Sequence, residues 1–247
     1  MTLISRKEKL GYCITNLLFI IFNRRREQGK LDTDGYTNNN NSPKKIRLEH
    51  LISFSDAIFA FSITFMAISI QIPNLPINHI TEQQFMSKLL QLLPQFEIYA
   101  VSFMIVGIYW ISYHLVFNHI RLSHSILIWL NLLFLFFITL ISFATYLDFK
   151  YGSFHSVFVL YASILTVTGS LLAFIWLHAT RENLLIDKSM SRFERRFMLY
   201  DLTIPPGIFM ISIGISFIDI QVAQYFWILV FVAKIATRKR LSEIVKR

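Results

Sequence analysis

An apolar segment over residues 54–73 begins with Phe54, Ser55 and Asp56 and ends at Pro73. As an α-helix, the part before the proline would be roughly 28 Å long, close to the thickness of a bilayer's hydrocarbon core. An acid inside such a helix is costly. We therefore expect Asp56 to be an N-terminal helix residue that faces protein or water and accepts from the first free backbone amides. The segment predicts a first membrane span with a polar entrance.

The composition indicates an all-α integral membrane protein. Apolar residues make up 54% of the chain and charged residues only 16%, whereas a soluble domain has about a quarter charged residues. The net charge of +9 would suit nucleic acid, but the placement of the bases argues against it. We therefore expect a lipid bilayer, and no nucleic acid, around this chain.

Six apolar segments predict six transmembrane helices. Residues 1–46 precede them and are interpreted as a cytoplasmic extension with a candidate interfacial helix and a polar linker. Residues 47–240 would form the transmembrane domain, and residues 241–247 a cytoplasmic tail. The segments cover residues 54–72, 95–117, 125–147, 157–178, 198–218 and about 221–237.

The positions of the basic residues predict the orientation of the chain. With six spans, all of the 24 Lys and Arg residues except Lys88 and Lys150 belong to the side that holds both termini. Cytoplasmic loops carry an excess of Lys and Arg. Both termini are therefore expected in the cytoplasm, with the chain as a multi-pass protein of the cell membrane.

The sequence contains no enzyme signature. The seven His residues do not form the spaced clusters of a metal site, and no Walker loop, GxSxG or HExxH motif occurs. A TVGYG-like filter segment is absent as well. We therefore expect no catalytic residues, no metal and no cofactor.

Two helical stripes of the first span lie side by side. One is small or polar and contains Asp56, Ala60, Thr64, Ala67 and Gln71, a pattern typical of close helix packing. The other contains Phe61, Thr64 (or Phe65) and Ile68. It would line a narrow hydrophobic pathway that gates by dewetting, or it would face lipid; periodicity alone leaves both open.

Polar residues also occur in the second and third spans. Trp110 and His114 lie one turn apart in the second span, and Asn131 lies early in the third. Polar groups in hydrocarbon are expected to find partners. Static interhelical hydrogen bonds would satisfy them, and a conducting or proton-carrying role is the alternative.

These elements resemble the transmembrane-protein-175 family of potassium channels, in its prokaryotic branch. The first helix of that family begins with Arg-x-x-x-Phe-Ser-Asp, and this sequence has FSDAIFAFSIT at 54–64. The family's second helix carries Tyr-Trp and then His, matched by Tyr109, Trp110 and His114. Its third helix starts with a Trp-Leu-Asn run, matched by IWLN at 128–131.

The resemblance implies a homotetramer of six-helix subunits around one central potassium pore. Its first helix would line the pore, with Phe61, Thr64 and Ile68 as the lining and gate residues. The same resemblance implies a structural polar network that fixes the helices. The network residues would be Phe54, Ser55, Asp56, His114 and Asn131.

Two positions depart from the family pattern. His50 stands where the family has its Arg, and the nearest Arg is Arg47, three residues upstream, so either of the two would complete the network. Phe61 stands where the family usually has an aliphatic residue, and a ring of four Phe side chains would narrow or close the pathway.

The sequence thus predicts a passive potassium or cation channel. A proton-coupled transporter that uses Asp56 and His114 is one alternative, and a non-conducting membrane scaffold is another. The sequence gives no gating stimulus, no potassium-over-sodium ratio and no role for residues 1–46.

Overall fold

The computed structural model describes residues 48–70, 81–121, 125–181 and 190–245. In this part of the chain all regular structure is helical. The helices are α2 (Leu48–Ile68), α3 (Glu82–Leu90), α4 (Leu93–Phe117), α5 (Ser125–Tyr151), α6 (His155–Arg181), α7 (Arg192–Ser216), α8 (Ile220–Phe226) and α9 (Ile228–Val245).

Six helical stretches are long and apolar enough to cross a membrane, which confirms the predicted all-α, six-span fold. Two of these spans consist of two consecutive helices. Gln91 and Leu92 join α3 to α4, and Trp227 joins α8 to α9. The proposed extension over residues 1–46 lies outside the described residues.

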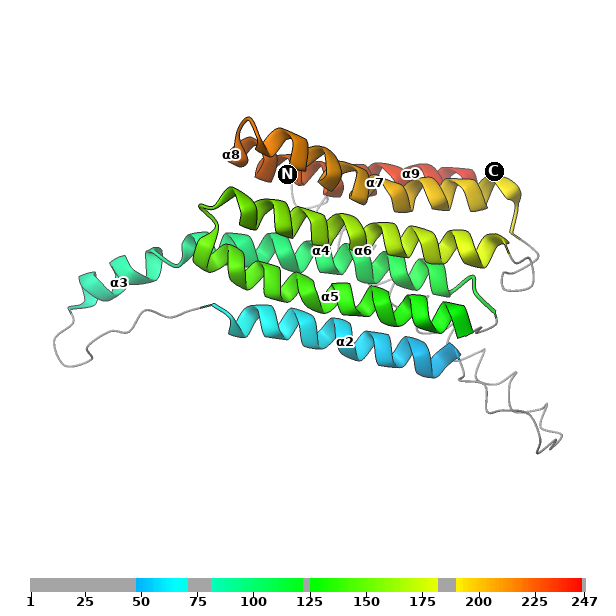
Figure 1. The fold of residues 1–247 in the computed structure, drawn as a ribbon, viewed down its shortest axis with the longest axis horizontal. Helices are drawn as coiled ribbons and strands as arrows, with labels where there is room; N and C mark the ends of the chain where they lie inside the picture. The colour runs from blue at the N-terminus through cyan, green and yellow to red at the C-terminus, as the bar shows by residue number, and fades with distance from the viewer. Residues whose placement is uncertain (1–47, 71–80, 122–124, 182–189, 246–247) are drawn as a thin grey trace, which may run out of the picture. The chain divides into compact units, whose positions relative to one another are not determined.

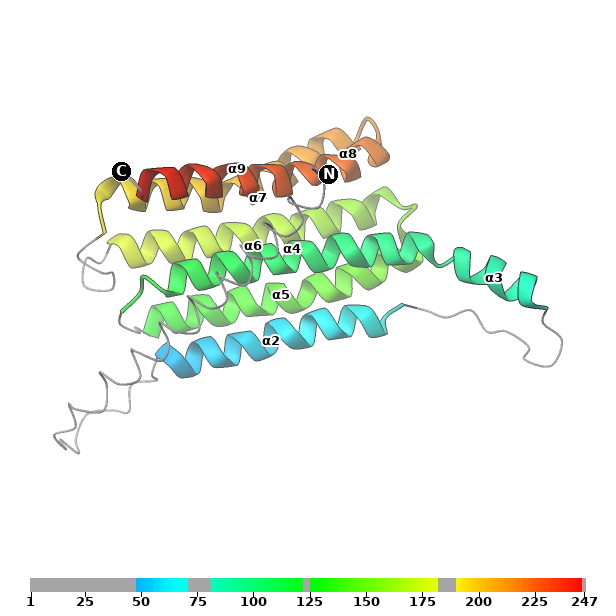
Figure 2. The same cartoon turned by 180° about the vertical axis from the view of Figure 1, so that it is seen from behind.

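The helices of the described chain lie roughly side by side (Figure 1). Both views show α2 at one side and α7 with α9 at the other, with α4, α5 and α6 between them (Figures 1 and 2). The core is formed by the buried faces of these helices, with aromatic side chains such as Trp176, Tyr113 and Phe134 fully enclosed.

Successive spans alternate in direction, so the helix ends collect at two ends of the bundle. We call one of them the basic end, where α2 and α7 begin and α4, α6 and α9 finish. Its described basic residues are Arg121, Arg181, Arg192, Arg195, Arg196, Arg238 and Lys239. The opposite end carries Lys88 and Lys150.

A capping box sets the start of α7. The backbone amide of Glu194 donates to Ser191 Oγ at 3.2 Å, and the amide of Ser191 donates to Glu194 Oε2 at 2.8 Å. This reciprocal arrangement satisfies two amides that a helix start leaves free. The helix therefore begins at Arg192, six residues before the apolar segment at 198–218 that the hydropathy indicates.

Gly169 allows α6 and α7 to approach closely. A Cβ atom built on Gly169 would lie 2.8 Å from Cδ of Pro206. α7 continues as one helix through Pro205 and Pro206. The proline ring therefore occupies the space that a side chain at position 169 would need.

An ion pair attaches α9 to α7. Lys234 Nζ lies 2.6 Å from Asp201 Oδ2, and the hydroxyl of Thr237 donates to Asp201 Oδ1 at 2.6 Å. Lys234 also donates to the backbone carbonyl of Asp201 at 2.9 Å. The topology count assigned Lys234 to the side that holds the termini, but it lies inside the last span, where a charge requires a partner.

Candidate functional site

α2 packs on the bundle through one face. Its buried residues recur every three or four positions, as a single helical stripe does, and are Leu51, Ser55, Phe59, Ser62 and Met66. The predicted stripe of small residues is not this face. Ala60 and Thr64 are exposed and Ala67 is half-buried, while Gln71 lies outside the described residues.

The opposite face of α2 is apolar, and no other part of the described chain covers it. Phe61 is 62% exposed and Ile68 74% exposed. Thr64, between them, is also exposed, and its hydroxyl donates to the Ala60 carbonyl at 2.8 Å. The ring of Phe61 stacks on Phe65 with centroids 5.9 Å apart. The three residues predicted to line a pore therefore share one exposed face.

Ser55 is the centre of a buried hydrogen-bond cluster. Its hydroxyl donates to the Leu51 carbonyl at 2.8 Å. It accepts from the Tyr113 hydroxyl of α4 at 2.8 Å and from Asn131 Nδ2 of α5 at 3.1 Å. One hydroxyl thus joins three helices, and all its hydrogen-bonding capacity is used. Oδ1 of Asn131 is buried and has no hydrogen-bond partner among the described residues.

Asp56 forms a second cluster, next to the first. Its Oδ1 accepts from Trp110 Nε1 at 3.0 Å and lies 2.7 Å from His114 Nε2. The rings of Trp110 and His114 meet edge to face, with centroids 4.6 Å apart. The carboxylate therefore connects α2 to α4 through two side chains one turn apart.

The expectation that Asp56 begins the first helix was wrong. The described helix already includes Leu48, so Asp56 lies more than two turns inside it. The backbone amides near Asp56 are used by the helix, and the carboxylate accepts from α4 side chains instead. A charge at this depth is tolerated because α4 supplies the partners that water would otherwise supply.

The other predicted network residues lie differently. Phe54 is 49% exposed, so its ring lies largely outside the packed core. His50 is exposed on the first turn of α2, and Arg47 lies outside the described residues. The structure thus joins Ser55, Asp56, His114 and Asn131 to side chains of neighbouring helices, but not Phe54.

Tyr113 was missed by the sequence interpretation. It is fully buried, bonds Ser55, and stacks on Phe117 with centroids 4.2 Å apart. Its position one turn after Tyr109 placed it on the same helical face as another large aromatic residue. That spacing could have indicated a buried aromatic stripe of α4.

A third polar cluster lies between α4, α5 and α6. The Tyr161 hydroxyl donates to Ser102 Oγ at 2.7 Å and lies 3.1 Å from Thr145 Oγ1. Nearby on α5, the Ser142 hydroxyl donates to the Ser62 carbonyl of α2 at 2.9 Å. These bonds satisfy buried hydroxyls and fix the register of the central helices.

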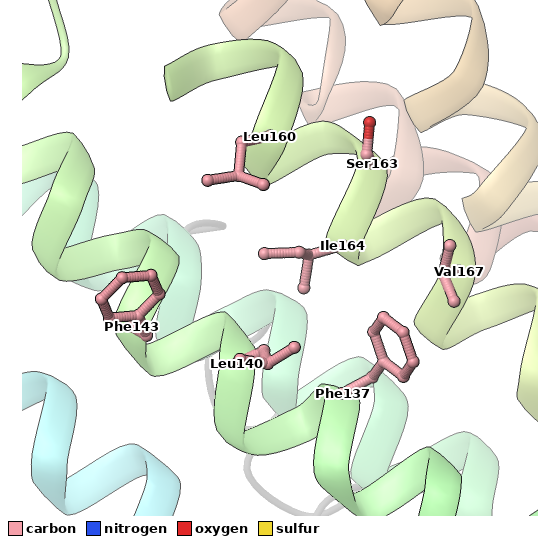
Figure 3. A pocket seen from close by; sticks show the side chains of 7 residues that line it. All are labelled: Phe137, Leu140, Phe143, Leu160, Ser163, Ile164 and Val167. Carbon is pink, nitrogen blue, oxygen red and sulfur yellow. The ribbon is translucent and has the colours of Figure 1, made fainter. Parts of the chain in front are cut away.

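An apolar groove runs between α5 and α6. Figure 3 shows side chains of both helices along it, with Leu140 and Ile164 facing each other across the groove. Ser163 is the one polar residue in its lining, which consists of Phe137, Leu140, Phe143, Leu160, Ser163, Ile164 and Val167. None of these residues belongs to the clusters around Ser55 and Asp56. Among the described residues, no group of three or more His, Cys, Asp or Glu could hold a metal ion.

Residues 50–141 match the sequence model of the family described as the endosomal/lysosomal potassium channel TMEM175. This range contains α4, nearly all of α2 and much of α5, with both clusters that join these helices. Over these residues the chain is similar to the TMEM175 family.

Three relatives, each named a potassium channel, are similar to parts of this chain. A potassium channel of Chamaesiphon minutus is 26% identical over 183 residues, which cover 72% of this chain and 89% of the relative. A potassium channel of Streptomyces collinus is 26% identical over 180 residues, covering 68% and 81%. A potassium channel of a Chryseobacterium species is 35% identical over 101 residues, covering 41% and 47%.

Two solved structures share the fold. The crystal structure of a lysosomal potassium-selective channel TMEM175 homolog from Chamaesiphon minutus superposes with a TM-score of 0.66 at 22% identity. The match covers 77% of this chain and 97% of that structure. A variant of the potassium channel MtTMEM175 gives a TM-score of 0.55 at 16% identity, covering 85% and 100%. The TMEM175 helix arrangement therefore extends over the described spans.

Proposed function

We propose that this chain is a passive potassium channel of the TMEM175 family, built as a homotetramer around a central pore lined by α2. The named relatives are potassium channels, which supports the ion and the class of activity. The observation that carries the proposal is the two-faced character of α2, because the helix is anchored on one side and uncovered on the other.

Because one face of α2 packs on the bundle, only the other face can line a pathway. Ser55 and Asp56 hold the helix to α4 and α5 through side-chain bonds. The uncovered face then presents Phe61, Thr64 and Ile68. Four copies of this face around one axis would form a hydrophobic constriction that contains a ring of threonine hydroxyls.

Such a constriction would gate by dewetting. A narrow apolar ring excludes water unless it widens, and ions cannot pass without their hydration or a substitute for it. Phe61 and Ile68 supply the apolar rings. The Thr64 oxygen retains a free lone pair beside its bond to Ala60, so it is available to a passing cation.

Bi-ionic recording in planar bilayers tests the channel function. Purified protein between potassium and sodium solutions should pass current without a pH gradient, and the reversal potential should favour potassium. Flux that requires a pH gradient, or none from correctly assembled tetramers, would contradict the proposal.

Charged thiol reagents test the lining. In a Cys13→Ser background, Phe61→Cys and Ile68→Cys channels should lose current when a cationic methanethiosulfonate reacts. Phe174→Cys is the matched control, because Phe174 is 52% exposed but lies on α6. Equal block in the control, or no block at 61 and 68 after proven modification, would remove α2 from the pore.

A proton-coupled transporter is the second candidate. The 2.7 Å contact between Asp56 and His114 favours it, since a carboxylate and an imidazole within a span resemble a proton relay. A carrier would give saturating flux driven by a pH gradient, and His114→Gln would abolish the coupling. In a channel the same change would mainly affect folding.

For the membrane orientation, we propose that the basic end lies in the cytoplasm of the cell membrane, with both termini on that side. The excess of Lys and Arg at this end supports it. In the same Cys13→Ser background, Ser153→Cys should react with an impermeant reagent on intact cells, while Asn118→Cys should not. Reaction at Asn118→Cys alone would reverse the orientation.

A further inference from the structure

A surface on the first turns of α7 combines exposed Arg side chains with aromatic side chains that are exposed or half-buried. We call it the Arg–Phe surface. It contains Arg192, Phe193, Arg196, Phe197 and Tyr200. At 100° per residue these five positions fall within a single arc of the helix, on the side opposite the buried Leu202.

The described chain leaves this surface open. Phe193 is 58% exposed and Tyr200 63% exposed. Arg192 and Arg196 are exposed beside them. The Phe193 and Phe197 rings stack with centroids 6.3 Å apart, which keeps the aromatic part of the surface together. The packing of α6 and α9 on α7 thus leaves an apolar strip bordered by two guanidinium groups.

The charges on this surface are not neutralised by the neighbouring acids of α7. Glu194 accepts from the Ser191 amide in the capping box. Asp201 is paired with Lys234 and Thr237 of α9. Glu194 and Asp201, the described acids nearest in sequence, therefore have other partners, so an anionic group from outside the described chain would complement Arg192 and Arg196.

The position of the Arg–Phe surface relative to the membrane indicates which kind of anion would bind there. α7 has 25 residues, so it is roughly 37 Å long and exceeds the ~30 Å hydrocarbon core by about a turn. The excess lies at the Arg-rich start. The guanidinium groups then reach the headgroup layer, while Phe197 and Tyr200 lie at the boundary that aromatic residues favour.

We propose that the Arg–Phe surface is a binding site for an anionic phospholipid, with Arg192 and Arg196 on the phosphate and Phe193 and Phe197 against the upper acyl chain. Arg guanidinium groups bind phosphate oxygens through paired N–H donors. The register of the Asp201–Lys234 pair brings Arg238 of antiparallel α9 to the same level of α7 and adds positive potential. This proposal does not rest on the proposed channel function.

Native mass spectrometry of the full chain in detergent, with added phosphatidylglycerol or phosphatidylcholine, tests the proposal. Wild-type protein should retain phosphatidylglycerol preferentially. Arg192→Gln/Arg196→Gln should lower the apparent affinity about thirtyfold, since each Arg near an anionic surface contributes a factor of about five. Phe193→Ala/Phe197→Ala should weaken binding of both lipids.

The matched control is Arg121→Gln/Arg181→Gln, which removes two exposed charges at the same end of the bundle. We expect its affinity to stay within about twofold of wild type, on the same reasoning about local charge. Arg192→Lys/Arg196→Lys keeps the charge and should retain part of the preference, which guards against a folding artefact in the Gln variant. Thermal unfolding in phosphatidylcholine checks that all variants are folded.

Three results would overturn the proposal. An equal loss in Arg121→Gln/Arg181→Gln would mean a diffuse charge effect. Equal retention of both lipids by wild type would mean that no phosphate is recognised. A changed subunit count in Arg192→Gln/Arg196→Gln with unchanged lipid retention would mean that the surface contacts a second copy of the chain.

Discussion

His114 and Asp56 lie 2.7 Å apart, Nε2 to Oδ1, and link α4 to α2 within the membrane-spanning part of the bundle. Both side chains are largely enclosed, at 13% and 31% exposure. Trp110 donates to the same carboxylate oxygen. The carboxylate is therefore part of the packing between two spans, and its removal should be felt first in folding.

The Asp56–His114 contact should show measurable energetic coupling. Asp56→Ala is expected to lower the free energy of unfolding by about 2 kcal/mol, the range for hydrogen bonds to a charged group. His114→Ala should cost less because Trp110 still bonds the carboxylate. The double variant should cost less than the sum, with a coupling of about 1 kcal/mol. SDS titration of the wild type, the two single variants and the double variant in micelles measures this coupling free energy. Additive losses would contradict it, as would an Asp56→Ala channel of unchanged stability that has lost selectivity.

The span count could be predicted from the sequence because membrane helices need long apolar runs, and those runs are plain in the sequence. Which face of α2 packs against the bundle could not be predicted from the sequence. Lipid-facing and core-facing residues are both apolar, so Phe59 at 1% exposure and Phe61 at 62% look alike in the sequence.

Side-chain partners were predicted only in part, for a related reason. Polar residues in a span must be paired, so Asp56, His114 and Asn131 were found as network residues. Which atoms they meet depends on helix rotation and register, which the sequence does not encode locally. Tyr113 and Lys234 were therefore missed, and Asp56 was placed at a helix start that lies at least eight residues earlier.

Ser55→Ala should destabilise the fold more than the removal of one hydroxyl group suggests. It leaves the Tyr113 hydroxyl and Asn131 Nδ2 buried without their acceptor. Each unpaired buried donor costs about 1–3 kcal/mol, so a loss of about 3 kcal/mol in the free energy of unfolding is expected by SDS titration. Ser69→Ala is the matched control, because the Ser69 hydroxyl donates to the Phe65 carbonyl four residues earlier and bonds no other helix of the described chain. Similar losses at both positions would argue against the interhelical role of Ser55.

Gly169→Ala should push α6 and α7 apart. The new Cβ would lie 2.8 Å from Pro206 Cδ, and a proline ring has little freedom to move away. Overpacking of this kind costs about 1–3 kcal/mol. The midpoint of thermal unfolding in detergent, read by tryptophan fluorescence, should fall.

Gly207→Ala is the control for Gly169→Ala, because nothing lies within 4 Å of its added Cβ. Alanine is favoured over glycine in a helix by up to about 1 kcal/mol, so this variant should be neutral or more stable. A Gly169→Ala protein as stable as Gly207→Ala would show that the α6–α7 contact adjusts without cost.

Removing one partner of the Asp201–Lys234 pair should cost more than replacing both. Lys234→Met leaves the Asp201 carboxylate with Thr237 alone, and breaking an enclosed pair in this way costs about 3–5 kcal/mol. Asp201→Asn/Lys234→Met should recover much of that stability in the same SDS assay. Lys88→Met, at an exposed site, should change it by no more than about 1 kcal/mol. A double variant less stable than Lys234→Met would mean that the pair contributes net stability to the bundle.

Substitutions on the uncovered face of α2 should change conduction without changing the fold. Phe61→Asn or Ile68→Asn should raise leak current, because a polar side chain keeps water in a constriction that otherwise dewets. Thr64→Val keeps the volume but removes the hydroxyl oxygen, so it should lower the current or alter potassium-over-sodium preference. Single-channel recording separates these effects.

Phe174→Asn, a polar substitution at an exposed site on α6, should conduct like wild type. If folded Phe61→Asn and Ile68→Asn channels also conduct like wild type, the pathway does not run along this face, and the neighbouring stripe of Ala60, Thr64 and Ala67 becomes the better candidate.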